Sequence, residues 1–102
     1  MSLRQLEDEL KSKGIPERGV EAASKVLVSI FTYANRPNSK PGLVSLQTIM
    51  DDLRSRLHED ITPLYVLDGV NILEANGYVT KSYGVYTLTP NAIDVFKQSQ
   101  PT

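Results

Sequence analysis

Apolar residues recur at intervals of three and four along most of the chain, a spacing that places them on one face of a helix. Glycine, proline and short polar runs divide this pattern into five segments. We therefore expect helices at about residues 2–13, 16–34, 46–58, 62–76 and 90–97. The apolar positions expected to face a common core are Val20, Ala23, Val26, Leu27, Ile30, Phe31, Ala34, Leu46, Ile49, Met50, Leu53, Leu57, Val66, Val70, Leu73, Ile93 and Phe96.

Short polar residues stand where these helices should begin. Ser2 followed by Gln5 is typical of a capping box, in which each side chain bonds the backbone N–H of the other residue. Ser45 is a candidate N-cap. Thr62-Pro63 and Thr89-Pro90 each join a capping residue to a proline that suits the first helical position.

The stretch NGYVTKSYGVYTLTP, from Asn76 to Pro90, has a different pattern. Two β-prone runs at residues 79–81 and 85–88 flank Ser82-Tyr83-Gly84, which predicts a hairpin with a tight glycine turn. Tyr78 and Tyr86 are expected to pack this hairpin on the core. Elsewhere we expect a very short strand at 43–44, a loop at 37–42, a polar turn at 58–60 and a frayed tail at 98–102.

Composition is that of one ordinary globular domain. The chain has 102 residues, 40% of them hydrophobic and 23% charged. We expect a single domain over residues 1–102, with an N-terminal helix at 1–15, a main unit at 16–97 and the tail. The formal net charge of -1 provides no basic field to attract phosphate, which counts against nucleic acid without excluding it.

Two absences in the sequence bear on location. No cysteine is present, so a disulfide framework or a thiolate metal site is excluded. No segment has the run of about 18 apolar residues that spans a bilayer. We expect a cytoplasmic or otherwise intracellular protein with no membrane partner.

The residues LEANGYV, 73–79, followed by YTLTP, 86–90, resemble the winged helix-turn-helix superfamily. In that family a leucine near the end of the recognition helix packs inward, glycine ends the helix, an apolar pair begins the wing and LTP leads out of it. The resemblance covers about residues 20–97. It implies an α+β winged helix-turn-helix, here with an extra N-terminal helix and a short hairpin wing. It also implies binding to double-stranded DNA, in transcription regulation.

The helix at 62–76 departs from this family pattern. By analogy its exposed face comprises Leu64, Tyr65, Asp68, Gly69, Asn71 and Ile72, with no lysine or arginine. DNA binding would therefore rely on Arg36, Lys40, Arg54, Arg56, Tyr65, Asn71, Lys81 and Tyr83. The alternative is a winged-helix module that binds protein within a larger complex, without direct DNA readout, through Leu64, Asp68 and Ile72.

The N-terminal helix leaves two interpretations open. Leu3, Leu6 and Leu10 share one face, which either completes the core or forms the seam of a homodimer. Among the tyrosines, Tyr65 and Tyr83 are expected to be exposed and to mark a ligand surface.

Catalytic and metal-binding chemistry is not expected, nor is a cofactor. His58 is the single histidine, and it lacks a second histidine or a cysteine to complete a metal site. Asp51 and Asp52 are neighbours in a helix and point about 100° apart, so we interpret them as first-turn acids that interact with the helix dipole. The sequence contains no glycine-rich phosphate loop, GxSxG or HExxH motif, and we expect no enzyme.

Overall fold

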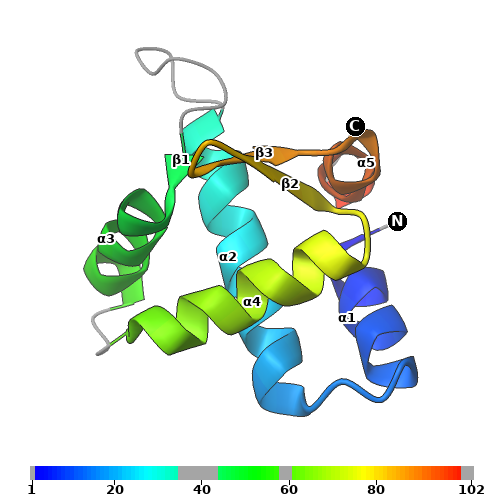
Figure 1. Ribbon diagram of the computed structural model, residues 1–102. Helices are drawn as coiled ribbons and strands as arrows, with labels where there is room; N and C mark the ends of the chain where they lie inside the picture. Colours follow the sequence, from blue (N-terminus) through cyan, green and yellow to red (C-terminus); the bar gives the residue numbers. More distant parts are fainter. Residues whose placement is uncertain (1, 35–43, 58–60, 100–102) are drawn as a thin grey trace.

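The structure is a computed structural model that describes residues 2–34, 44–57 and 61–99. These residues form an α+β arrangement of helices around a small antiparallel sheet (Figure 1). In chain order the elements are α1 (Leu3–Ser12), α2 (Glu17–Ala34), β1 (Val44–Ser45), α3 (Leu46–Leu57), α4 (Pro63–Ala75), β2 (Val79–Ser82), β3 (Val85–Leu88) and α5 (Pro90–Ser99). The predicted order of elements is confirmed, while the expected loop at 37–42 and turn at 58–60 lie outside the described residues.

The helices begin at the predicted capping residues. The Ser2 hydroxyl accepts a bond from the Gln5 backbone N–H at 3.2 Å, and the Gln5 side chain accepts one from the Ser2 N–H at 2.7 Å. At α4, the Thr62 hydroxyl accepts from the Tyr65 N–H at 3.2 Å, and Pro63 takes the first helical position. Each cap satisfies a backbone donor that the helix itself leaves free.

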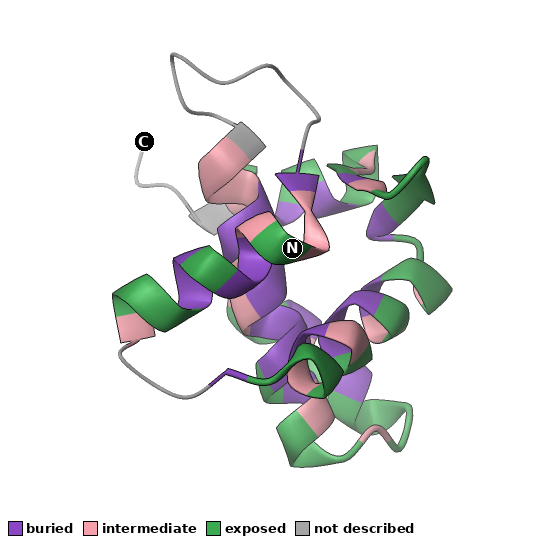
Figure 2. Cartoon of the chain, turned by 60° about the vertical axis from the view of Figure 1, so that its left-hand side comes forward, coloured by how far each residue is buried: buried purple, intermediate pink, exposed green. Residues whose placement is uncertain are grey.

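α2 is the central helix, because α1, α3, α4 and the sheet all contact it. Figure 2 shows buried residues on the surfaces where the helices meet and exposed ones at the periphery. The fully or almost fully buried apolar side chains of α2 are Val20, Ala22, Ala23, Val26, Leu27 and Ile30. All of them except Ala22 were predicted from the helical spacing, so one face of α2 forms the middle of the core.

α4 lies across α2 at a point where both helices carry a small residue (Figure 1). A Cβ atom on Gly69 would lie 2.7 Å from the carbonyl oxygen of the buried Ala22 and 2.9 Å from a methyl group of Val26. The prediction that Gly69 is on the exposed face is therefore wrong. Only glycine lets the two backbones approach this closely.

The strands pair in the order β1-β3-β2. Val44 of β1 pairs with Tyr86 of β3, and Val79 of β2 pairs with Leu88. Tyr78 and Tyr86 are buried as predicted, so the sheet contacts the core through aromatic side chains. This layout is compatible with the expected winged helix-turn-helix.

A two-residue turn, Tyr83-Gly84, connects β2 to β3. Both residues have positive φ, 52° and 76°, the combination that a type I′ hairpin turn requires. Glycine adopts such angles freely, whereas a bulky residue there is strained by about 1 kcal/mol or more. The Tyr83 side chain is fully exposed, so packing within the chain does not offset this strain.

α5 differs from the prediction in its inward face and in its length. The pattern predicts Ile93 inward, but Ile93 is 40% exposed while Ala92 and Val95 are fully buried. Phe96 stacks on Phe31 of α2 with ring centroids 3.9 Å apart, and this contact fixes the rotation of the helix. α5 also continues to Ser99, so residues 98 and 99 are helical rather than frayed.

α1 completes the core. Leu6 and Leu10 are fully buried and Leu3 is half-buried against the same cluster. Of the two interpretations left open for these leucines, the structure shows the core position for Leu6 and Leu10. A homodimer, which remains a prediction, would need other contact residues.

Replacing Gly69 by alanine should lower the free energy of unfolding by about 1–3 kcal/mol, because the added methyl group overpacks the α2–α4 contact. Gly19→Ala is the matched control, since the nearest atom to its added Cβ, at 2.9 Å, is the terminal methyl of Ile72, which can move. Urea unfolding followed by circular dichroism measures both. Equal losses in the two variants would contradict the special role of Gly69.

Replacing Leu10 by alanine should lower stability by about 2–5 kcal/mol, the usual cost of truncating a fully buried leucine. Leu64→Ala serves as control and should change stability by less than about 0.5 kcal/mol, because Leu64 is largely exposed. Thermal unfolding and light scattering distinguish the alternatives. If Leu10→Ala left the stability unchanged but converted a dimer into a monomer, the core position of Leu10 would be contradicted.

Candidate functional site

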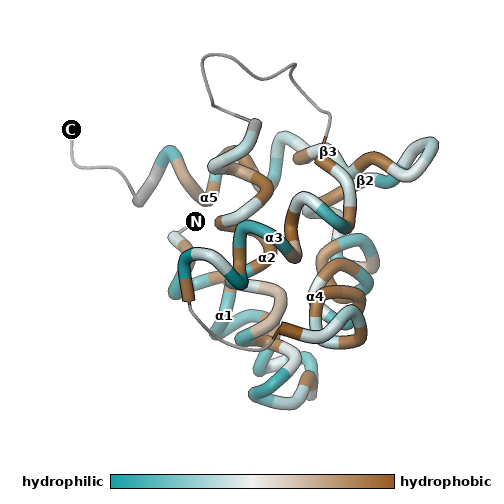
Figure 3. Tube along the Cα trace, turned by 90° about the vertical axis from the view of Figure 1, so that its left-hand side faces the viewer, coloured by the Kyte–Doolittle hydropathy of each residue, from teal (hydrophilic) through white to brown (hydrophobic). Residues whose placement is uncertain are grey.

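The outward side of α4 is the candidate surface. Burial of Val66, Gly69, Val70 and Leu73 determines the rotation of this helix. The residues left on its outer side are the exposed Leu64, Asp68 and Asn71 and the half-buried Ile72, which we term the α4 face. Figure 3 shows that α4 and the turn between β2 and β3 lie on the same side of the molecule, so one ligand could contact both.

The α4 face is apolar and acidic. Leu64 is 73% exposed, one of three large hydrophobic side chains of that kind among the described residues. α4 carries two charged residues, Asp68 and Glu74, and both are exposed acids. The departure from the family pattern that the sequence indicates is therefore present on the surface, with no cation on the helix.

A groove of about 400 Å³ lies beside Ile72, between α4 and the start of α2. Its surface is mainly apolar, and its lining residues are Pro16, Arg18, Gly19, Asp68, Asn71 and Ile72. Gly19 keeps the groove open, because a Cβ at that position would lie 2.9 Å from Ile72 Cδ1. The contribution of α2 to this groove could not be read from the sequence, since residues 16–19 are distant from α4 in the chain.

The two arginines of α3 that were candidates for DNA contact bind the protein itself. Arg56 donates to Asp52 Oδ2 through Nε at 2.9 Å and pairs with it through Nη2 at 2.8 Å. Arg54 Nε donates to the carbonyl oxygen of Ile61 at 3.1 Å. Arg56 thus neutralises a carboxylate that is 4% exposed, and Arg54 links α3 to Ile61, which precedes the N-cap of α4.

The interpretation of Asp51 and Asp52 as first-turn acids is wrong. Both lie beyond the first turn of α3, which contains no acid. Asp52 pairs with Arg56 four residues later, and Asp51 accepts a hydrogen bond from Gln47 Nε2 at 2.8 Å. The spacing of four between Asp52 and Arg56 was a readable signal for this ion pair.

Tyr65 is half-buried rather than exposed. Its hydroxyl donates to Glu21 Oε1 at 3.5 Å, so it faces α2. Glu21 also accepts a hydrogen bond from Lys25 at 2.7 Å, and this contact lowers the pKa of its carboxyl group below the ordinary value. Tyr65 therefore belongs to the α2–α4 contact more than to the outer surface.

The hairpin supplies the remaining predicted contacts. Lys81 is exposed, with Nζ 5.8 Å from the centre of the Tyr86 ring, and Tyr83 is fully exposed at the turn. Asn71 of the α4 face is exposed as well. Asn71, Lys81 and Tyr83 are thus exposed, whereas Tyr65 faces α2.

The predicted DNA contacts Arg36 and Lys40 lie outside the described residues, as does His58, for which no metal or catalytic role was expected. Within the described ranges, no three or more histidine, cysteine, aspartate or glutamate side chains gather in a way that could hold a metal ion. None of the helices in these same ranges combines the length and the apolar character needed to cross a membrane.

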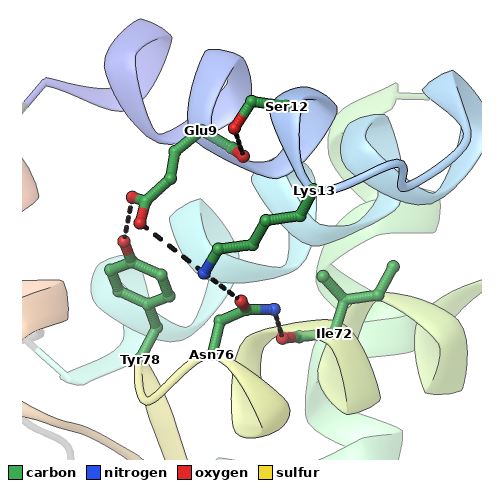
Figure 4. A network of polar contacts seen from close by, with 6 residues as sticks. All are labelled: Glu9, Ser12, Lys13, Ile72, Asn76 and Tyr78. Atoms are coloured by element: carbon green, nitrogen blue, oxygen red, sulfur yellow. Dashed lines mark hydrogen bonds and ion pairs between the residues drawn. The ribbon is translucent and has the colours of Figure 1, made fainter.

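A network of polar contacts joins α1 to the end of α4 (Figure 4). Lys13 Nζ donates to Asn76 Oδ1 at 2.6 Å and lies 3.6 Å from Glu9 Oε1. The Tyr78 hydroxyl donates to Glu9 Oε2 at 2.8 Å, and Asn76 Nδ2 donates to the Ile72 carbonyl at 2.7 Å. The network fixes the end of the helix that carries the α4 face.

Burial raises the pKa of Tyr78 to about 12, and the hydrogen bond to the Glu9 carboxylate adds to the effect. Both causes favour the neutral phenol, because a phenolate would be poorly solvated and would face a carboxylate. Tyr78 is therefore a hydrogen-bond donor at neutral pH, with a structural role between α1 and β2.

Comparisons of the chain with protein-family models, curated proteins and solved structures found no match. The chemistry of the α4 face and the hairpin turn is therefore the basis for a functional proposal.

In an absorbance titration at alkaline pH, Tyr78 should ionise near pH 12, against an ordinary value of 10.0. Since the pKa is raised in the folded state, the stability it contributes is present below about pH 10 and is lost between about pH 10 and 12. Glu9→Gln should lower the pKa of Tyr78 but leave it above 10, because burial remains. Tyr78→Phe identifies the signal; a late transition that persists in Tyr78→Phe would contradict the assignment.

Proposed function

We propose that the chain is a winged helix-turn-helix module that binds another protein through the α4 face, within a larger complex. The observation that carries this proposal is the combination on α4 of a 73% exposed leucine, two acids and no cation. In the winged-helix resemblance this helix is the one that would enter a DNA groove. Its chemistry suits a protein surface better than a phosphate backbone.

The arrangement of elements supports the winged-helix part of the proposal. α3 and α4 form the helix pair, β2 and β3 the wing, and β1 joins the sheet next to β3. α1 is an addition to this plan, since it packs on α2 and α5. α4 and the turn between β2 and β3 lie on the same side of the molecule in the view of Figure 3.

Exposed apolar surface favours a protein partner. Burying a leucine side chain such as Leu64 in an interface contributes about 1.5–3 kcal/mol to the free energy of binding. Without a partner this apolar side chain stays exposed to water, which is unfavourable. Ile72 and the neighbouring groove extend the apolar surface along α4. An apolar residue flanked by a pocket is a common arrangement at the centre of protein interfaces.

Tyr83 supports a binding role for the hairpin turn. The residue has a strained positive φ and is fully exposed, so it contributes little to folding. Asparagine or glycine would suit the turn better. Tyrosine is enriched at interfaces because one side chain offers both apolar area and a hydrogen-bonding hydroxyl.

Double-stranded DNA, in transcription regulation, is the second candidate. The exposed side chains of Lys81, Tyr83 and Asn71 favour it, as does the family resemblance. Asp68 and Glu74 oppose it, because two carboxylates would approach phosphates. Arg54 and Arg56 are also engaged in contacts within the protein.

The proposal predicts that Leu64→Asp abolishes co-purification of a partner from an extract of the source cells, whereas Ile93→Asp leaves it intact. Both changes add one carboxylate at an exposed apolar residue, but Ile93 lies on α5. Quantitative mass spectrometry of the captured proteins, with circular dichroism to verify folding, gives the comparison. Equal capture by the Leu64→Asp protein and the unaltered chain would contradict binding through α4.

A titration with a mixed-sequence DNA duplex at low and moderate salt tests the second candidate in parallel. If DNA is the partner, Lys81→Ala should weaken binding and reduce its dependence on salt, because fewer counterions are released. Saturable, salt-sensitive binding with shifts on α4 would replace the protein-binding proposal by the DNA-binding one.

A further inference from the structure

We infer that the partner presents a basic amphipathic helix, whose apolar side chains cover Leu64 and Ile72 and whose central lysine or arginine pairs with Asp68. The inference rests on the proposed function, because it names the kind of protein that the α4 face would bind. It is carried by the position and the charge of Asp68, which lies between the two apolar residues of the face.

Leu64, Asp68 and Ile72 follow one another at intervals of four, so they form one row along α4. At a rise of about 1.5 Å per residue, Leu64 and Ile72 are about 12 Å apart along the helix axis. A partner helix that lies along this row matches it with two apolar residues seven or eight positions apart. Its residue halfway between them faces Asp68.

Any partner that covers both Leu64 and Ile72 must also cover Asp68. None of the ion pairs among the described residues involves Asp68, and α4 carries no cation. Burying a carboxylate without a cation beside it is strongly unfavourable, because the charge loses its hydration. A purely apolar partner helix would not compensate for this desolvation energy. A lysine or arginine at the middle position removes it and also excludes acidic partners.

The groove beside Ile72 offers a place for an apolar side chain of the partner helix. With a volume of about 400 Å³ and walls that include Pro16 and Gly19, it can accept a large apolar side chain. Arg18 and Asp68 both line this groove. We therefore expect an apolar residue of the partner helix to enter the groove beside Ile72, while its cation pairs with Asp68.

A second copy of the chain fits less well. If two α4 faces met about a two-fold axis, each would present the same apolar row with its central acid. α4 offers no cation to pair with Asp68 of the other copy. The two carboxylates would then be covered together with Arg18 of each groove as the nearest cation, whereas the basic helix supplies a positive charge of its own.

Synthetic helical peptides test the inference with the full chain. The first peptide has two leucines separated by seven positions and a lysine midway, and the second differs only by glutamate at that lysine. Amide shifts of the isotope-labelled chain report where each peptide binds. The lysine peptide should shift residues 64–72 and bind about tenfold more tightly than the glutamate peptide, as expected for one charge pair against one repulsion.

Charge reversal supplies the decisive comparison. Asp68→Lys should invert the preference, so that the glutamate peptide binds more tightly. Glu74→Lys is the matched control, because it makes the same charge change on the same helix outside the row, and it should leave the preference unchanged. Circular dichroism confirms that both variants fold.

The outcomes separate this inference from the proposed function. If both peptides bind residues 64–72 equally and Asp68→Lys changes nothing, the basic helix is excluded while protein binding by the α4 face stands. If the shifts of the lysine peptide map to another element, both proposals fail. Salt-sensitive shifts of residues 64–72 with duplex DNA, and none with either peptide, would replace both by the DNA-binding function.

Discussion

The close contact between α2 and α4 at Ala22 and Gly69 is the constraint on which the rest of the structure depends. Because no side chain separates the two backbones there, the rotation of α4 is determined within narrow limits. Val66, Val70 and Leu73 then enter the core. The side of α4 that faces outward, with Leu64 and Asp68, follows directly from this contact.

Both ends of α4 are held by polar contacts, and these contacts use several of the chain's cations. Arg54 bonds the Ile61 carbonyl ahead of α4, and Lys13 bonds Asn76 at its end. Arg56 is paired with the nearly buried Asp52. The positive charge that a DNA-binding surface would need is thus partly used for folding, and the surface of α4 remains acidic and apolar.

Three features of the structure are not required for folding. Leu64 is exposed, Gly19 leaves a groove open beside Ile72, and Tyr83 occupies a strained position at the hairpin turn. In a protein selected only for folding stability, a different residue at each of these positions would be more favourable. These three features support the binding role that we propose, and the position of Asp68 between Leu64 and Ile72 supports the positively charged partner that we infer.

The sequence by itself determined the elements, because caps, turns and helical periodicity depend on residues within about four positions of one another. It also identified Leu64, Asp68, Asn71 and Ile72 as outward residues. Only the tertiary structure decided that Gly69 is buried, that Ile93 is exposed and that Leu6 and Leu10 complete the core. It alone brought Pro16, Arg18 and Gly19 beside α4. The rotation of a helix and the lining of a groove depend on which element, distant in the sequence, packs against them. Local sequence patterns do not identify that element.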